Sequence, residues 1–270
     1  MNVTFSQRLS ELRSRKQSVL CVGLDPDPAR IPISLLSGNT PEQATSIFCR
    51  DIIGATASSA VAFKINFAFF EALGDSCFSV MRDVLAVIPD DVLTIADAKR
   101  GDIGNSASFY ARSVFDDLGY DSVTVSPYMG RDSVDPFLGK PGTCAFVLAR
   151  TSNPGGNDLQ LLPVEGELLY EYTARKAVHW AEGLPGETGL VVGATDTVSL
   201  SRLRNQFPDT PFLVPGVGAQ GGSGKDVMDA SGDGPLLVNS SRAILYASSD
   251  EDYATAAARK ADETRISLGS

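Results

Sequence analysis

The sequence contains almost no histidine. Its 270 residues include one, His179, in the late helix-like segment Val178-His179-Trp180. Zinc and non-haem iron sites depend on histidine ligands, and a serine–histidine–aspartate triad needs a histidine base. Histidine-based metal or nucleophilic catalysis is therefore disfavoured, and we expect His179 to be a surface residue on a helix.

Basic charge is also scarce. The chain has 23 Lys and Arg residues against 33 Asp and Glu residues, which gives a formal net charge of −10. Nucleic acids and anionic membranes bind extended basic surfaces, so we expect neither as a partner. A small anionic ligand is still compatible with this composition, because a few local cations are enough to bind it.

The features of a secreted or membrane protein are missing as well. Residues 1–16 form a short amphipathic helix candidate without the apolar core of a signal peptide, and no apolar run approaches the ~20 residues that span a bilayer. The cysteines are widely spaced and form no C-x-x-C pair, which indicates buried reduced thiols. They are Cys21, Cys49, Cys77 and Cys144. We expect a soluble, cytoplasmic protein.

Short apolar runs recur along the chain and predict strands. Each is rich in Val, Ile, Leu or Phe and is continuous rather than alternating, which is typical of parallel strands buried on both faces. The runs are Val19–Leu24, Val61–Asn66, Val92–Asp97, Ser122–Val125, Cys144–Ala149, Gly189–Val192, Phe212–Val214 and Leu236–Val238.

Helix-like segments separate these runs. The clearest are Glu42–Ser59, Glu71–Ile88, Ile103–Leu118, Glu165–Glu182 and Glu251–Ile266, with shorter ones near Arg131, Thr197 and Gly224. Eight strand–helix units in about 250 residues, without a linker, predict a (β/α)₈ TIM barrel. We expect a single barrel domain over residues 1–270, with an N-terminal helix. An open doubly wound sheet is the alternative.

Local signals support these boundaries. Thr40-Pro41 fits a helix N-cap followed by proline at the first helical position, and Leu118-Gly119 fits a helix stop. The segment Arg150–Pro163 is long and rich in Gly, Asn and Pro, which predicts a mobile loop at an active site.

Charged residues occur where the predicted strands end. Asp97 and Lys99 are two residues apart at the end of the third strand, so strand alternation places them on one side. Lys64 interrupts the second strand, and Asp25 follows the first. Strand ends meet at the mouth of such a barrel, so we expect these four residues there, with Asp102 nearby. Partly buried charges persist only when they are paired.

Each of these residues also has an ordinary structural explanation. Lys64 is compatible with a snorkelling or edge lysine, Asp25 with a turn, and Asp102 with the cap of the following helix. Asp97 and Lys99 are compatible with a structural ion pair. Four such coincidences at the ends of three consecutive strands favour a functional site over separate explanations.

Two loops predict a phosphate site. The seventh strand runs into Pro215–Gly222, which is rich in glycine, and the eighth into Asn239–Arg242. Loops after these strands commonly bind phosphate in TIM barrels, and Arg242 offers a guanidinium fork. No Walker A pattern occurs, and no G-x-G-x-x-G opens a helix after the first strand, so a nucleoside triphosphate or dinucleotide is not indicated.

The residues of the third strand resemble a known signature. The segment Asp97-Ala98-Lys99-Arg100-Gly101-Asp102-Ile103-Gly104-Asn105-Ser106 resembles the D-x-K-R-x-D-I-x-x-T signature of the orotidine 5'-monophosphate decarboxylases. Other blocks look like that family in its longer bacterial form, so the resemblance spans essentially the whole chain. They are Val22–Pro26, Phe63–Glu71, Pro215–Gly222 and Val238–Arg242.

The resemblance implies an activity and an assembly. The family removes CO₂ from orotidine 5'-phosphate, which leaves UMP, and it uses no metal or cofactor. The resemblance also implies a homodimer of barrels with shared active sites. Lys64, Asp97 and Lys99 would form a charged array in one subunit, and Asp102 would come from the partner subunit.

The resemblance also implies substrate contacts. Asp25 would bind the ribose hydroxyls, Ser152 would contact the pyrimidine ring, and Gln220 and Arg242 would bind the phosphate. Ser106 stands where the signature usually has threonine. It keeps the hydroxyl, so a ribose contact from the neighbouring subunit is still expected.

Two other functions stay open at this stage. A keto-sugar-phosphate decarboxylase on a related barrel uses Mg²⁺, but it has an acidic metal ligand at the position of Lys64. Carboxylates alone can hold Mg²⁺, although interleaved lysines already neutralise their charge. A non-catalytic barrel that binds a nucleotide is the other alternative, and it would not call for Asp97 beside a substrate carboxylate.

Overall fold

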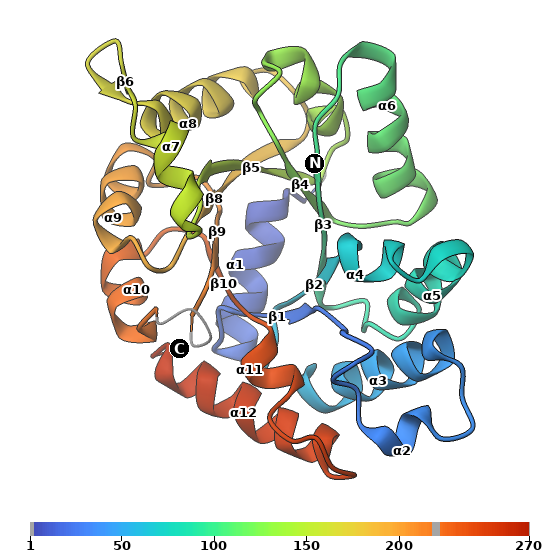
Figure 1. Ribbon diagram of the computed structural model, residues 1–270. Coiled ribbons are helices and arrows are strands. Elements are labelled where there is room, and N and C mark those ends of the chain that lie inside the picture. The colour runs from blue at the N-terminus through green and yellow to red at the C-terminus, as the bar shows by residue number, and fades with distance from the viewer. Residues whose placement is uncertain (1–2, 218–221, 270) are drawn as a thin grey trace.

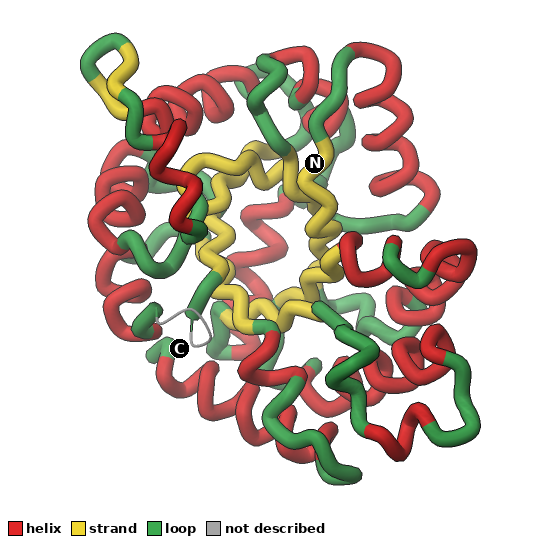
Figure 2. The backbone as a smooth tube through the Cα atoms, in the orientation of Figure 1, coloured by secondary structure: helices red, strands yellow, loops and turns green. Residues whose placement is uncertain are grey.

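Eight parallel strands close into a barrel. The computed structural model describes residues 3–217 and 222–269, and its strands follow the order β1-β10-β9-β8-β5-β4-β3-β2 around the ring (Figures 1 and 2). They are β1 Leu20–Leu24, β2 Ala62–Asn66, β3 Leu93–Arg100, β4 Ser122–Val125, β5 Cys144–Arg150, β8 Glu187–Val192, β9 Phe212–Pro215 and β10 Leu236–Ser240. Every predicted strand forms. The predicted barrel is confirmed, and the open doubly wound sheet is wrong.

Helices surround the barrel on its outside, except α1, which lies across one end, as Figure 2 shows. They are α1 Phe5–Lys16, α2 Ile33–Leu36, α3 Pro41–Thr56, α4 Phe67–Glu71, α5 Cys77–Leu85, α6 Gly104–Arg112, α7 Asn157–Gln160, α8 Leu169–Trp180, α9 Thr197–Gln206, α10 Gly224–Ser231, α11 Arg242–Leu245 and α12 Tyr253–Ser267. The expected cap of α3 is confirmed: Thr40 accepts a hydrogen bond from the Gln43 amide, and Pro41 is the first helical residue.

Several of the expected helices differ from the prediction. The one expected near Arg131 forms two 3₁₀ turns, Arg131–Ser133 and Asp135–Leu138, and the one expected over Ile103–Leu118 changes at Ser113 from α6 to a π-helical turn. The segment expected over Glu71–Ile88 is divided, because α4 ends at Glu71 and a 3₁₀ turn over Gly74–Ser76 precedes α5. Gly74 has a φ of +65°, a left-handed conformation that breaks the α-helix. The apolar period continues across this break, so periodicity alone did not reveal it.

The helix expected from Glu165 begins later, at Leu169. Residues 163–168 form a small hairpin of β6 Pro163–Val164 and β7 Glu167–Leu168 instead. Its turn residues Glu165 and Gly166 both have positive φ, at +52° and +90°. A two-residue turn of this kind favours glycine and joins antiparallel strands tightly.

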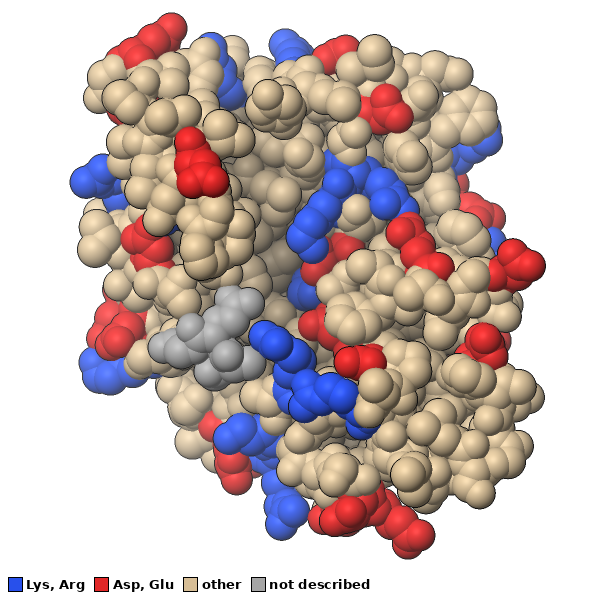
Figure 3. Space-filling model, viewed as in Figure 1, with Lys and Arg blue, Asp and Glu red and all other residues tan. Residues whose placement is uncertain are grey.

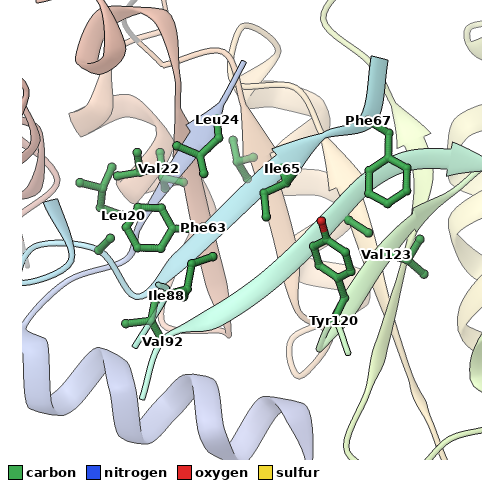
Figure 4. Close-up of a cluster of buried hydrophobic side chains, with 14 of the residues drawn as sticks. Leu20, Val22, Leu24, Phe63, Ile65, Phe67, Ile88, Val92, Tyr120 and Val123 are labelled. Atoms are coloured by element: carbon green, nitrogen blue, oxygen red, sulfur yellow. The ribbon is translucent and has the colours of Figure 1, made fainter. Parts of the chain in front are cut away.

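Alternate residues of each strand pack on opposite sides of the barrel wall. Leu20, Val22 and Leu24 of β1 lie beside Phe63 and Ile65 of β2 in the layer between the strands and the outer helices (Figure 4). The intervening residues face the barrel interior. Because both faces are buried, the strands read as continuous apolar runs rather than alternating ones.

Helix α1 closes one end of the barrel. Phe5, Leu9 and Leu12 are buried in a cluster with interior residues of the strands, and Figure 1 shows α1 across the far opening of the ring. A capping box fixes its start, since Thr4 and Gln7 exchange side-chain and backbone hydrogen bonds. This apolar plug leaves only the opposite end, where the strands have their carboxyl termini, for chemistry.

Polar contacts fasten the rim of α1 to several strands. Arg8 forms an ion pair of 2.6 Å with Asp121, which precedes β4, and the Ser6 amide donates to Glu187 of β8 at 3.1 Å. The Lys16 ammonium donates to the backbone carbonyls of Ala57 and Ala60 before β2, at 2.7 and 3.0 Å. The helix is therefore held around the circumference of the barrel.

Substitution of Leu9 tests this closure. Leu9→Ala leaves a cavity between α1 and the strands, so we expect the free energy of unfolding in urea to fall by about 2–5 kcal/mol. Ser10→Ala changes an exposed position of the same helix and is the control, with an expected change below about 0.5 kcal/mol. Equal effects of the two substitutions would contradict the proposed plug.

Candidate active site

Two lysines converge on one carboxylate at the open end of the barrel. The ammonium of Lys64 lies 2.7 Å from Oδ2 of Asp97, and that of Lys99 lies 2.5 Å from Oδ1. Oδ1 of Asp25 is 3.9 Å from the Lys64 ammonium. Figure 3 shows a hollow at the centre of this face, with basic and acidic side chains around it. The structure thus brings together the four residues that the sequence predicted at the mouth.

A β-bulge in β3 orients the side chains of Asp97 and Lys99. Ala96 pairs with Val123 of β4, but the next pair is Arg100 with Val125, so β3 contains extra residues between the two pairs. Lys99 lies in this bulge with a φ of +46°, a left-handed conformation that costs a residue with a side chain about 1–2 kcal/mol. Simple alternation predicted that Asp97 and Lys99 share a side; the structure achieves this through the bulge.

A residue that was not predicted from the sequence stabilises the bulge through hydrogen bonds. Thr124 of β4 accepts a hydrogen bond from the Lys99 amide at 3.0 Å and donates one to Oδ1 of Asp97 at 3.1 Å. Thr124 is the last polar residue of its strand. The rule that selected Lys64, a polar residue near the end of an apolar strand, would also have selected it.

Opposite charges keep the array ionised despite its burial. Lys64 is 4% exposed and Asp97 9%. Burial by itself raises the pKa of Asp97, but the attraction of Lys64 and Lys99 outweighs this and holds the pKa well below its usual range. Burial likewise opposes the charge of Lys64, and Asp97 and Asp25 together raise its pKa. Both groups are therefore charged at neutral pH.

A cavity of about 170 Å³ adjoins the array. The residues that line it come from the charged array and from the ends of β9 and β10. They are Asp25, Lys64, Asn66, Asp97, Pro215, Gly216, Val217, Asn239, Ser241 and Arg242. Gln220, the other residue predicted to contact phosphate, lies outside the described residues. A larger surface cavity of about 1000 Å³ between Pro28–Leu36 and Tyr246–Glu251 has none of the predicted site residues in its lining.

The first and eighth units meet closely beneath this cavity. A Cβ on Gly23 would lie 1.9 Å from Oγ of Ser241 and 2.9 Å from Oδ1 of Asn239, so only glycine fits. The side-chain amide of Asn239 donates a hydrogen bond to Oγ of Ser241 at 3.2 Å. Asn239 and Ser241 lie in the block 238–242 singled out from the sequence, but neither was predicted as a site residue.

Asp102 and Ser106 do not join the array of their own chain. The carboxylate of Asp102 accepts a hydrogen bond from the Ile103 amide at 2.8 Å, and among the described residues no ion pair links it to Lys64 or Lys99. Helix α6 starts after Ile103 without a side-chain cap. Ser106 is exposed on the first turn of α6.

Ser152 lies in the loop after β5, and Arg150 anchors this loop. Arg150, 8% exposed, contacts Asp196 at 2.9 Å and Asn157 at 2.8 Å, so it ties this loop to the loop after β8. Gly193 packs directly against Ser152, since a Cβ there would lie 2.9 Å from the serine. Ser152 therefore lies on the side of the mouth formed by β5 and β8.

Histidine and cysteine lie away from the mouth. His179 is exposed on α8 and lies 3.2 Å from Glu182, as expected for a surface residue on a helix. All four cysteines are buried and form no disulfide. Within residues 3–217 and 222–269, no group of three or more His, Cys, Asp or Glu side chains is arranged to hold a metal ion.

Comparisons with known proteins identify the family of the chain. The family model described as "Orotidine 5'-phosphate decarboxylase / HUMPS family" matches residues 18–258. An orotidine 5'-phosphate decarboxylase of Paracidovorax citrulli is 47% identical over 277 residues, which cover 98% of each chain. One of Dehalococcoides mccartyi is 43% identical over 271 residues, 98% of this chain and 97% of its own.

A solved structure extends the likeness to three dimensions. The OMP decarboxylase of Leishmania donovani superposes with a TM-score of 0.81 at 38% identity, over 97% of this chain and 99% of its own. The fold and these relatives define a decarboxylase built on a (β/α)₈ barrel. The chain belongs to the orotidine 5'-phosphate decarboxylase / HUMPS family.

Asp97→Asn tests the charge pairing through pH. The folded-state pKa of Asp97 is below that of an unfolded aspartate, about 3.9, so its stabilisation is complete above about pH 5 and is lost as pH falls below about 4. We expect the free energy of unfolding of the wild type, measured in urea, to fall more steeply with acid than that of the variant. Parallel curves down to about pH 3 would contradict the pairing.

Proposed function

We propose that the chain decarboxylates orotidine 5'-phosphate to UMP, within pyrimidine biosynthesis, as a single barrel domain over residues 1–270. The observation that carries this proposal is the convergence of Lys64 and Lys99 on the buried carboxylate of Asp97. Such an array costs desolvation energy and has no role in closing a barrel. The relatives that are 42–47% identical to this chain all carry the name orotidine 5'-phosphate decarboxylase.

The reaction breaks the bond between C6 of the pyrimidine and its carboxylate. CO₂ leaves without the bonding electron pair, so negative charge develops at C6. The ammonium of Lys99 stabilises this charge and then donates its proton to C6, which completes UMP. Lys99 is left neutral and regains a proton from solvent.

The neighbouring charges prepare Lys99 for this role. Asp97 lies beside the substrate carboxylate, where repulsion favours departure of CO₂, and its Oδ1 holds the Lys99 ammonium at 2.5 Å. Lys64 holds Asp97 from the other side at 2.7 Å. The array therefore supplies electrostatic stabilisation and a proton without a metal or organic cofactor.

The rest of the substrate binds along the cavity. Asp25, whose Oδ1 is buried without a hydrogen-bond partner among the described residues, is available to the ribose hydroxyls. Arg242 and Gln220 bind the phosphate, and Ser152 contacts the pyrimidine from the loop after β5. Phosphate binding is remote from the reacting bond, and its energy favours closure of the surrounding loops.

The two alternative functions are less well supported. Lys64 occupies the position at which the magnesium-dependent sugar-phosphate enzymes have an acidic ligand, and its ammonium fills the space beside Asp97. A nucleotide sensor needs cations for phosphate, but it does not need a buried carboxylate where the substrate carboxylate would lie. Decarboxylation accounts both for the lysine at position 64 and for the buried carboxylate of Asp97.

We propose further that the site is shared within a homodimer. Asp102 and Ser106 point to this because they do not reach the array of their own chain, although they belong to the signature. Around them lie exposed apolar side chains: Ile103, Phe109, Tyr110, Tyr128 and Met129. Gly101 packs against Ser126, so the segment that leads into α6 adjoins the loop after β4. A second copy of this chain is the partner that would cover them and receive Asp102.

The expected location also stands as a proposal. In the parts of the chain that the structure describes, no helix has the length and apolar character needed to cross a bilayer. The buried thiols and the pathway suit the cytoplasm, and we propose that compartment.

An assay on orotidine 5'-phosphate in excess EDTA tests the function. We expect the wild type to convert the substrate to UMP with chelator present, and Lys99→Ala to lose at least about 10³-fold in kcat, because it removes both the cation and the proton donor. Loss of orotate absorbance measures the rate. Wild-type turnover by Lys99→Ala would refute the proton-donor role, and loss of wild-type activity in EDTA would favour a metal enzyme.

Hybrid dimers test the shared site. Lys99→Ala and Asp102→Ala are each expected to be inactive, but after subunit exchange half of the dimers are hybrids with one intact site. Activity should then recover to about a quarter of the wild-type value. A mixture of Lys99→Ala with Lys64→Ala is the control and should recover nothing, because both lysines come from the same subunit. No recovery in the first mixture, despite demonstrated exchange, would argue against sharing.

A further inference from the structure

We propose that Thr124 is a positioning residue, whose hydroxyl holds Lys99 in the left-handed conformation that directs its ammonium to Asp97. The inference rests on the proposed decarboxylation, because Lys99 is the proton donor of that reaction. It adds to the charged array a neutral residue from the neighbouring strand.

The hydroxyl of Thr124 joins the backbone of Lys99 to the side chain of Asp97. Its oxygen accepts from the Lys99 amide at 3.0 Å, and its proton goes to Oδ1 of Asp97 at 3.1 Å. Oδ1 is also the atom that contacts the Lys99 ammonium, at 2.5 Å. The three groups therefore form a closed ring of contacts through one carboxylate oxygen.

The bulge explains why such a group is needed. Between the pairs Ala96–Val123 and Arg100–Val125, β3 leaves the regular register, so the Lys99 amide has no carbonyl of β4 opposite it. A buried amide without a partner is costly, and a left-handed φ of +46° is unfavourable for lysine. A hydroxyl, which accepts and donates at once, satisfies the amide and fixes the carboxylate together.

Thr124 is placed to act through Lys99 rather than on the substrate. It is 2% exposed, and both hydrogen bonds of its hydroxyl go to Lys99 and Asp97. Substrate and product are expected to bind equally well with or without its hydroxyl, whereas the placement of the Lys99 ammonium changes. Loss of the hydroxyl should therefore lower kcat and leave KM and the affinity for UMP unchanged.

Two substitutions of Thr124 separate the hydroxyl from the side-chain volume. Thr124→Val keeps the shape and removes both hydrogen bonds, so we expect kcat on orotidine 5'-phosphate to fall about 10- to 100-fold, with KM and the Kd for UMP within about twofold of wild type. Thr124→Ser keeps the hydroxyl and should restore kcat to within about threefold of wild type.

Thr94 supplies a matched control at the closed end of the barrel. Its hydroxyl donates to the Asp121 carboxylate at 2.9 Å and accepts from the Asp121 amide at 3.0 Å, a similar pair of hydrogen bonds between β3 and the residue that precedes β4. Thr94→Val should lower the Tm as much as Thr124→Val does, yet leave kcat within about twofold of wild type. Rates are compared well below either Tm.

The outcomes divide clearly. Wild-type kcat in Thr124→Val, equal loss of kcat in Thr94→Val, or failure of Thr124→Ser to restore the rate would each overturn the proposal. A crystal structure of Thr124→Val tests it without any assay: Lys99 outside the left-handed region supports it, and an unchanged Lys99 contradicts it. If the wild type itself does not turn over orotidine 5'-phosphate, the proposed function fails, and this structural comparison still decides the role of Thr124.

Discussion

One buried carboxylate, shared between two ammonium groups, is the interaction on which the mouth of this barrel depends. Each oxygen of Asp97 faces a different lysine, so the buried Lys64 ammonium and the buried carboxylate both have a counter-charge. Hydrophobic burial and the closed strand ladder stabilise the rest of the domain. The charges stabilise one another, and they require a fold rigid enough to hold them together.

Much of the architecture could be predicted because the barrel wall is buried on both sides. Continuous apolar runs are a direct consequence of that burial, and every strand was found near its predicted position. The hairpin at Glu165-Gly166 and the break at Gly74 were not foreseen. In both places the apolar period continues while one or two residues with positive φ redirect the backbone, and periodicity reports side-chain burial rather than backbone handedness.

The site residues also divide into those that the sequence could predict and those that it could not. Asp25, Lys64, Asp97 and Lys99 could be predicted because each interrupts or ends an apolar strand. Thr124, Asn239 and Ser241 were missed because the analysis sought charged residues at the strand ends, although a neutral hydroxyl or amide there can orient charged groups. Asp102 was expected near the mouth from its position, but its role and that of Ser106 followed only from the family resemblance, since their proposed partners belong to a second chain.

The plug formed by α1 has a consequence for molecular traffic. A barrel sealed at one end has a single doorway, so the nucleotide enters, and both the gas and the shortened nucleotide leave, by the same route. Departure therefore runs past the ends of β9 and β10, whose residues line the cavity.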